Sequence, residues 1–195
     1  MAARPHVVVI LGQDCDPAAY WVEQFEANWI SLTGGNVSFF YPPLVAGVRA
    51  WHSYTPGRSE DWARTHRASR YHVELAETAP QVFKLLDVLE SGKLPFSVCA
   101  YSNGGAIAFE AGIAYAFCKS VLWVASVPVL SQQHRSAELK CPVGFLHGTR
   151  DRYYFGGHDA VKIVAEKCAG HWSEYDGGHS DCSESLAYTE LMHLS

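Results

Sequence analysis

The chain has 195 residues, of which 48% are hydrophobic and 18% charged, a composition typical of one globular domain and unlike a disordered or fibrous protein. Its formal net charge of −5, without any cluster of Lys and Arg, argues against nucleic acid as a partner. No apolar run approaches the length of a membrane span, and the run at 7–11 is too short for a signal peptide.

The six cysteines are scattered, without a C-x-x-C pair. Cys99 and Cys141 stand in or beside strand-like runs, which favours small buried side chains. This usage indicates a reducing compartment, so we expect a cytoplasmic protein. The sequence does not decide whether Cys168 and Cys182 form a disulfide, and it does not indicate the oligomeric state.

Short apolar runs alternate with segments of helical periodicity along the chain. Strands are expected at 7–11, 37–41, 96–101, 121–125, 142–146 and 172–175. Helices are expected at 17–32, from about 65 to 92, from 102 to about 117, at 158–169 and at 183–192. This alternation is typical of right-handed βαβ units. We therefore expect an α/β fold, a three-layer α/β/α sandwich around a mainly parallel sheet of about six strands, in a single domain over residues 1–195.

Some residues in the helical segments, and in the long connection between the first two of them, allow more specific predictions. Pro80 interrupts the second segment, so it either kinks one long helix or opens another. The residues after 43 lack periodicity but are rich in aromatic side chains, which a plain connector does not need. In the first helix, the apolar residues expected towards one side are Tyr20, Phe25, Trp29 and Leu32.

A serine stands where the strand at 96–101 gives way to a helical pattern. The sequence Ala100-Tyr101-Ser102-Asn103-Gly104 has small residues two positions before and after the serine, as a sharp strand-to-helix turn requires. Such a turn lifts the Ser102 hydroxyl above the sheet edge. The amide of Asn103, at a helix N-terminus, then points at any anion formed beside it.

This segment resembles the G-x-S-x-G nucleophile elbow of the α/β-hydrolase superfamily, with Ala in place of the first Gly. The resemblance implies an acid and then a histidine after the serine. His147-Gly148-Thr149-Arg150-Asp151 resembles the family's H-G-x-x-D after a strand, and Gly177-Gly178-His179 its G-G-H loop. It therefore implies a triad of Ser102, Asp151 and His179. Asp159 and Asp176 are alternative acids and His171 is a rival base, whereas His147 is expected to serve the turn.

The resemblance also implies where the oxyanion and the substrate would bind. One oxyanion donor is the amide of Asn103, and the other is the amide of Gln13, in the loop after the first strand. The family topology sets the first strand beside the third, with a ligand crevice at their carboxyl ends. Candidate substrate-binding residues at that edge are Gly12, Trp51, His52, Tyr54 and Trp62. The aromatic ones fit a satellite hydrophobic cluster equally well.

The resemblance spans most of the chain, and the segment at 128–140 is too short for a large cap domain. It implies a minimal α/β-hydrolase fold and a serine hydrolase that cleaves a carboxylic ester or thioester through an acyl-enzyme. Two alternatives remain: a non-catalytic ligand-binding protein of this fold, and an acyltransferase using the same triad. No metal or organic cofactor is expected, because H-E-x-x-H, Cys/His clusters and G-x-G-x-x-G are all absent from the sequence.

Overall fold

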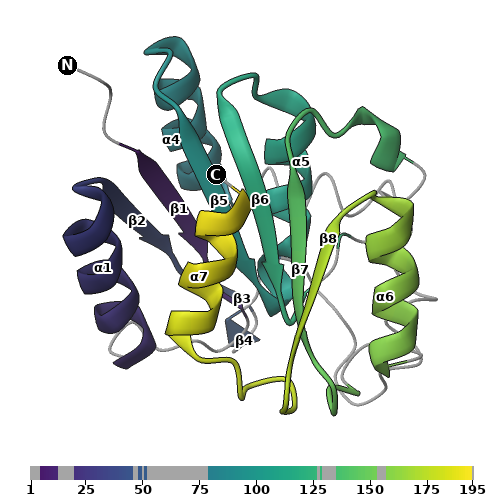
Figure 1. Ribbon diagram of the computed structural model, residues 1–195. Helices are drawn as coiled ribbons and strands as arrows, with labels where there is room; N and C mark the ends of the chain where they lie inside the picture. The colour runs from purple at the N-terminus through teal and green to yellow at the C-terminus, as the bar shows by residue number, and fades with distance from the viewer. Residues whose placement is uncertain are drawn as a thin grey trace.

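A six-stranded parallel sheet forms the centre of the protein (Figure 1). The computed structural model describes residues 5–12, 20–45, 48–49, 51, 79–126, 128, 135–152 and 157–194. The sheet strands are β1 (His6–Ile10), β2 (Asn36–Phe40), β5 (Phe96–Tyr101), β6 (Cys118–Val124), β7 (Val143–Gly148) and β8 (His171–Tyr175). The prediction of a six-stranded parallel sheet is confirmed.

The strand order is β2-β1-β5-β6-β7-β8, with β1 hydrogen-bonded to both β2 and β5. The chain therefore moves outward from β1 to β2 on one side. It then returns to β5 and proceeds through β6, β7 and β8 on the other. This reversal is the topological switch point at which α/β sheets bind ligands, beyond the carboxyl ends of the strands. The first and third predicted strands, β1 and β5, were expected to be adjacent in the sheet, and this is confirmed.

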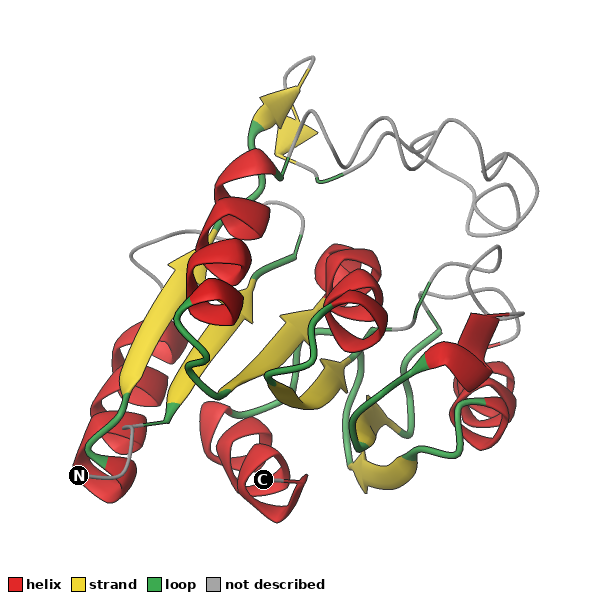
Figure 2. Ribbon diagram, turned by 90° about the horizontal axis from the view of Figure 1, so that it is seen from above, coloured by secondary structure: helices red, strands yellow, loops and turns green. Residues whose placement is uncertain are grey.

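Helices cover both faces of the sheet, which makes the three-layer sandwich that the sequence predicted (Figures 1 and 2). One face carries α1 (Tyr20–Thr33) and α7 (Glu184–Leu194), which pack against each other. The other face carries α4 (Pro80–Ser91), α5 (Gly105–Ala114) and α6 (Gly157–Lys167).

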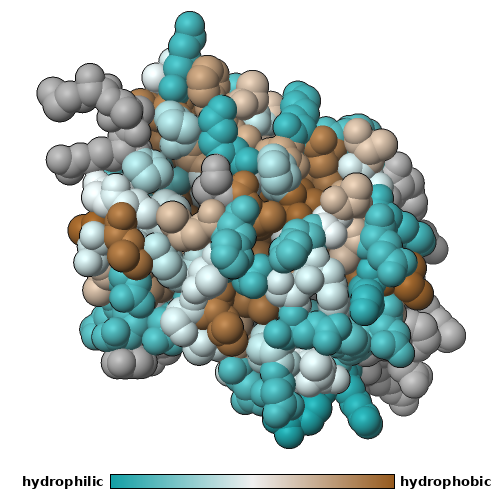
Figure 3. All heavy atoms as spheres, in the orientation of Figure 1, coloured by the Kyte–Doolittle hydropathy of each residue, from teal (hydrophilic) through white to brown (hydrophobic). Residues whose placement is uncertain are grey.

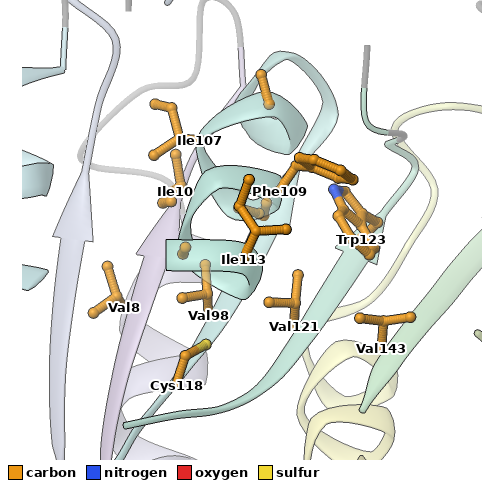
Figure 4. Packing of buried hydrophobic residues seen from close by; sticks show 14 of the residues in the cluster. Val8, Ile10, Val98, Ile107, Phe109, Ile113, Cys118, Val121, Trp123 and Val143 are labelled. Carbon is orange, nitrogen blue, oxygen red and sulfur yellow. The ribbon is translucent and has the colours of Figure 1, made fainter. Parts of the chain in front are cut away.

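Alternation along the strands divides the core into two layers. In β1, Val8 and Ile10 point towards α4 and α5, whereas Val7 and Val9 point towards α1 and α7. Figure 4 shows the first layer, in which Ile113 of α5 lies near Val98 and Val121 of the sheet and Ile107 lies beside Ile10. Because every sheet strand except the outer β2 and β8 is apolar on both faces, the strands read as continuous hydrophobic runs in the sequence.

The structure tests two predictions about helices, one on the buried side of α1 and one on the role of Pro80. In α1, Phe25 and Trp29 are buried, but Leu32 is 66% exposed, because the last turn of the helix extends past the core. α4 begins at Pro80, which occupies its first position and follows Ala79 in a non-helical conformation. Of the two alternatives, a kink in one long helix or the start of another helix, the second is therefore correct.

Other local expectations need correction. α5 ends at Ala114 instead of about 117, since Tyr115 is already extended. A short antiparallel hairpin, β3 (Leu44–Val45) and β4 (Val48–Arg49), follows β2 and was not predicted. The thiols of Cys168 and Cys182 are both free, so the bridge left open above is not formed.

Hydrophilic and hydrophobic residues are interspersed on the face of the molecule seen in Figure 3. Several large apolar side chains contribute to the surface, among them Leu32, Leu44 and Val88, each more than half exposed. Within the described ranges, the helices are all too short or too polar to cross a membrane.

Candidate active site

Ser102 follows β5 directly and has a strained backbone conformation. It opens η1 (Ser102–Gly104), one turn of 3-10 helix that leads directly into α5, and its φ is 49°. A residue other than glycine in this left-handed region costs about 1–3 kcal/mol and persists only when its surroundings enforce it. Part of that enforcement is a hydrogen bond from the Ser126 hydroxyl to the carbonyl oxygen of Ser102. This is the sharp turn that the sequence predicted for the serine.

Two glycines allow the turn to lie close against the sheet. A Cβ placed on Gly12, in the loop after β1, would lie 2.7 Å from Cβ of Ser102. A Cβ on Gly104 would lie 2.7 Å from the carbonyl oxygen of Ile10. Both distances are too short for carbon and oxygen atoms in contact, so glycine is required at each position. Gly104 is the small residue that the motif placed two positions after the serine.

Ser102, His179 and Asp151 form one row of hydrogen bonds. Oγ of Ser102 is 2.7 Å from Nε2 of His179, and Nδ1 of His179 is 2.9 Å from Oδ2 of Asp151. The ionised carboxylate can only accept, so Nδ1 donates to it and Nε2 accepts the serine hydroxyl. Asp151 is 1% exposed and the His179 side chain 20%. The row therefore runs from a buried acid to a base that reaches the surface.

The register of β7 and β8 brings the acid and the base together. Their ladder continues beyond both strands: the N–H of Thr149 donates to the carbonyl of Tyr175, and the N–H of Arg150 to that of Gly177. The next residue after Arg150 is the acid, and the base follows Gly177 by two residues. The two sequence motifs thus meet at the same edge because they follow neighbouring parallel strands.

The loop that carries His179 is fastened by three further contacts. The hydroxyl of Tyr101, next to the serine, donates to the carbonyl of His179 at 2.7 Å. The hydroxyl of Tyr175 donates to the carbonyl of Gly178, whose N–H donates to the Asp181 carboxylate. Because the main chain is held on both sides of the imidazole, the ring has little freedom to leave Ser102.

A second imidazole lies against the same carboxylate. Nε2 of His147 is 3.4 Å from Oδ2 of Asp151, and the His147 side chain is 1% exposed. Burial lowers the pKa of His147 to about 4, against a smaller opposing influence of Asp151. His147 is therefore neutral near pH 7. The sequence assigned it only to the turn, because nothing in the H-G-x-x-D pattern reveals that its ring faces the acid.

The rival residues considered in the sequence lie elsewhere. Asp176 is 3.5 Å from Arg150 with its side chain 89% exposed, and Asp159 contacts His158 at the surface. The exposed His171 stands at the beginning of β8, 3.4 Å from Glu190. The carboxylate that bonds His179 is thus that of Asp151.

The structure describes only part of the expected oxyanion and substrate residues. Gln13, His52, Tyr54 and Trp62 lie outside the described residues. Gly12 is buried against the serine, and Asn103 follows it in η1. Trp51 is only 2% exposed, so little of its surface is open to a substrate. Within the described part of the chain, no group of three or more His, Cys, Asp or Glu side chains could hold a metal ion.

Comparison with solved structures identifies the fold. The esterase PE8 superposes with a TM-score of 0.70 at 17% identity, over 100% of this chain and 94% of that one. A protein from Xanthomonas campestris assigned to the α/β-hydrolase superfamily gives 0.61 at 16% identity, over 96% and 98%. A cold-adapted esterase from an Arctic intertidal metagenomic library gives 0.65 at 13%, over 99% and 84%. No protein-family model and no curated protein sequence matches the chain. The protein has the α/β-hydrolase fold.

Proposed function

We propose that the protein is a serine hydrolase that cleaves a carboxylic ester or thioester through an acyl-enzyme. The observation that carries the proposal is the row of hydrogen bonds from Ser102 through His179 to Asp151. A serine hydroxyl is a weak nucleophile near neutral pH and needs a positioned base, which in turn needs a group that fixes its tautomer. The row supplies these three parts in order. The esterases among the similar structures agree with this reading.

In the proposed reaction, Oγ of Ser102 attacks the carbonyl carbon while Nε2 of His179 takes the hydroxyl proton. Asp151 holds Nδ1–H and stabilises the imidazolium that forms. The tetrahedral oxyanion is bound by main-chain amides of Asn103 and Gln13. His179 then returns the proton to the leaving alcohol or thiol, and a water molecule, activated in the same way, releases the acyl group.

The proposal treats residues 1–195 as one domain with a small-molecule acyl substrate. The main support is that a single sheet takes strands from His6 to Tyr175, and both helical layers pack on that sheet. The proposed reaction requires no metal or organic cofactor, since nucleophile, base and oxyanion donors all come from the chain.

A fluorophosphonate probe tests the proposal directly, because it reacts covalently with an activated serine. We expect wild type to be labelled and Ser102→Ala not to be. The matched control is Ser38→Ala, which removes another serine in contact with a histidine and should leave labelling unchanged. A panel of p-nitrophenyl esters of increasing chain length then tests turnover and acyl preference.

The outcomes separate the proposal from its two alternatives. Folded wild type that is neither labelled nor active would overturn the hydrolase and favour a non-catalytic binding protein. Labelling with transfer of the acyl group to an added alcohol, in preference to water, would favour an acyltransferase. Product analysis by mass spectrometry distinguishes the ester formed in that case from the free acid.

A further inference from the structure

Trp51 contacts two segments that lie far from it in the sequence. Its indole N–H donates to the carbonyl oxygen of Leu11 at 2.6 Å, and its main-chain N–H donates to the side-chain oxygen of Asn103 at 2.7 Å. Its ring belongs to the buried cluster beneath α4 and α5. The hairpin β3–β4 ends just before Trp51, at Arg49. One residue thus fastens the loop after β1 to the residue that follows the serine.

The two contacted segments are those to which the proposed reaction assigns the oxyanion donors. The Leu11 carbonyl and the Gly12 N–H belong to one planar trans peptide and point in opposite directions. A bond that fixes this carbonyl therefore also fixes the direction of the N–H of Gly12, the residue that precedes the proposed donor Gln13. Gly12 itself packs against Ser102. The other contact holds the side chain of Asn103, whose main-chain amide is the second proposed donor.

We propose that Trp51 is a positioning residue that holds both oxyanion-donor segments in register with Ser102. The assignment rests on the proposed function and adds to it a residue that acts without touching substrate, in keeping with its 2% exposure. Deleting one oxyanion donor typically lowers kcat by about 10²–10³-fold. Loss of the Trp51 bond displaces a donor without deleting it, so we expect a smaller effect of about tenfold.

The test is Trp51→Phe, which removes the indole N–H but keeps an aromatic ring and the main-chain N–H. We expect kcat for a p-nitrophenyl ester to fall about tenfold with KM changed by less than about twofold. The affinity for a trifluoromethyl ketone should fall by the same factor as kcat/KM. This inhibitor accepts Oγ of Ser102 at its carbonyl carbon while the proton passes to His179, and the oxyanion left behind occupies the proposed hole.

The matched control is Trp29→Phe. Trp29 is another buried indole, 1% exposed, in α1 and lining a hollow near the beginning of β1 and β5, away from the serine. The same loss of volume there should lower thermal stability but leave kcat and the inhibitor affinity within about twofold. Equal losses in Trp51→Phe and Trp29→Phe, or a loss in Trp51→Phe confined to KM, would overturn the positioning role.

A second variant covers the case in which Trp51→Phe fails to fold. Asn103→Ala removes the acceptor of the Trp51 main-chain N–H and keeps the proposed amide donor. We expect a fall of about threefold in kcat and in inhibitor affinity together, and an unchanged kcat would count against the assignment. Folded wild type that hydrolyses neither esters nor thioesters and is not labelled by the fluorophosphonate would refute the hydrolase itself and this role with it, whereas active wild type with unaffected variants refutes the role alone.

Discussion

Two of the contacts between a serine hydroxyl and a histidine ring in the described part of the chain lie at opposite ends of the sheet. Beyond the carboxyl ends of the strands, Oγ of Ser102 is 2.7 Å from Nε2 of His179. At the amino end of β1, Nε2 of His6 is 3.0 Å from Oγ of Ser38. The two contacts are alike in length and in the atoms joined. Their surroundings differ in every respect that nucleophilic catalysis requires.

Ser38 lies inside β2 with extended backbone, whereas Ser102 sits in a left-handed turn at the start of a helix. The far nitrogen of His179 meets the Asp151 carboxylate. For His6, no ion pair with a carboxylate is found among the described residues, and burial lowers its pKa, which makes it a weaker base. The comparison teaches that a hydrogen bond between serine and histidine does not define a catalytic site. What distinguishes the proposed site at Ser102 is the carboxylate on the far nitrogen of the imidazole and the strained turn that holds the serine.

The largest predicted difference comes from replacing each histidine by a residue that cannot act as a base. We expect His179→Gln to lower kcat for ester hydrolysis by about 10⁵-fold or more, because neither proton transfer retains a base. His6→Gln should leave kcat within about twofold. Steady-state kinetics with a p-nitrophenyl ester measures both. Comparable losses in the two variants would mean that the base has been assigned to the wrong end of the sheet.

The acid gives the next largest effect. Asp151→Asn presents an N–H to the imidazole and favours the tautomer in which Nε2 carries the proton, so that Nε2 can no longer accept from Ser102. We expect kcat to fall about 10⁴-fold while the fold is retained. Asp176→Asn is the control, since that side chain is 89% exposed and pairs only with Arg150 among the described residues. Activity that survives Asp151→Asn but not Asp176→Asn would reverse the choice of acid.

The sequence could predict the strands, the turn at Ser102 and the pairing of distant motifs because each rests on short-range chemistry. A small residue on either side of a serine fixes a turn, and an apolar run fixes a buried strand. Parallel strands bring their carboxyl ends to one edge, and the resemblance to the H-G-x-x-D and G-G-H motifs selected Asp151 and His179 there, 49 and 77 residues from the serine.

Contacts without a local pattern could not be predicted. Trp51 lies 52 residues from Asn103, and nothing in its neighbourhood reveals that its two N–H groups meet two different loops. The strands β3 and β4 are two residues long each, which is too short for any periodicity. Leu32 was predicted on the apolar side of its helix but is exposed. Helical spacing gives the direction of a side chain, but it does not show where the core ends.

The smallest effect concerns stability, and it arises from a third imidazole, that of His147. Burial lowers its pKa to about 4 in the folded protein, compared with about 6.5 in an unfolded chain. Between these values the unfolded chain binds a proton that the folded protein does not, so the free energy of unfolding decreases as the pH falls through this window. At pH 4.5 this group alone should lower the free energy of unfolding by about 2 kcal/mol relative to pH 7.5. His147→Gln cannot bind that proton, so urea denaturation should show a smaller loss of stability for the variant than for wild type over the same interval. Equal losses would mean that the buried ring is already protonated in the folded protein, and the carboxylate of Asp151 would then be shared between the His147 cation and the His179 ring.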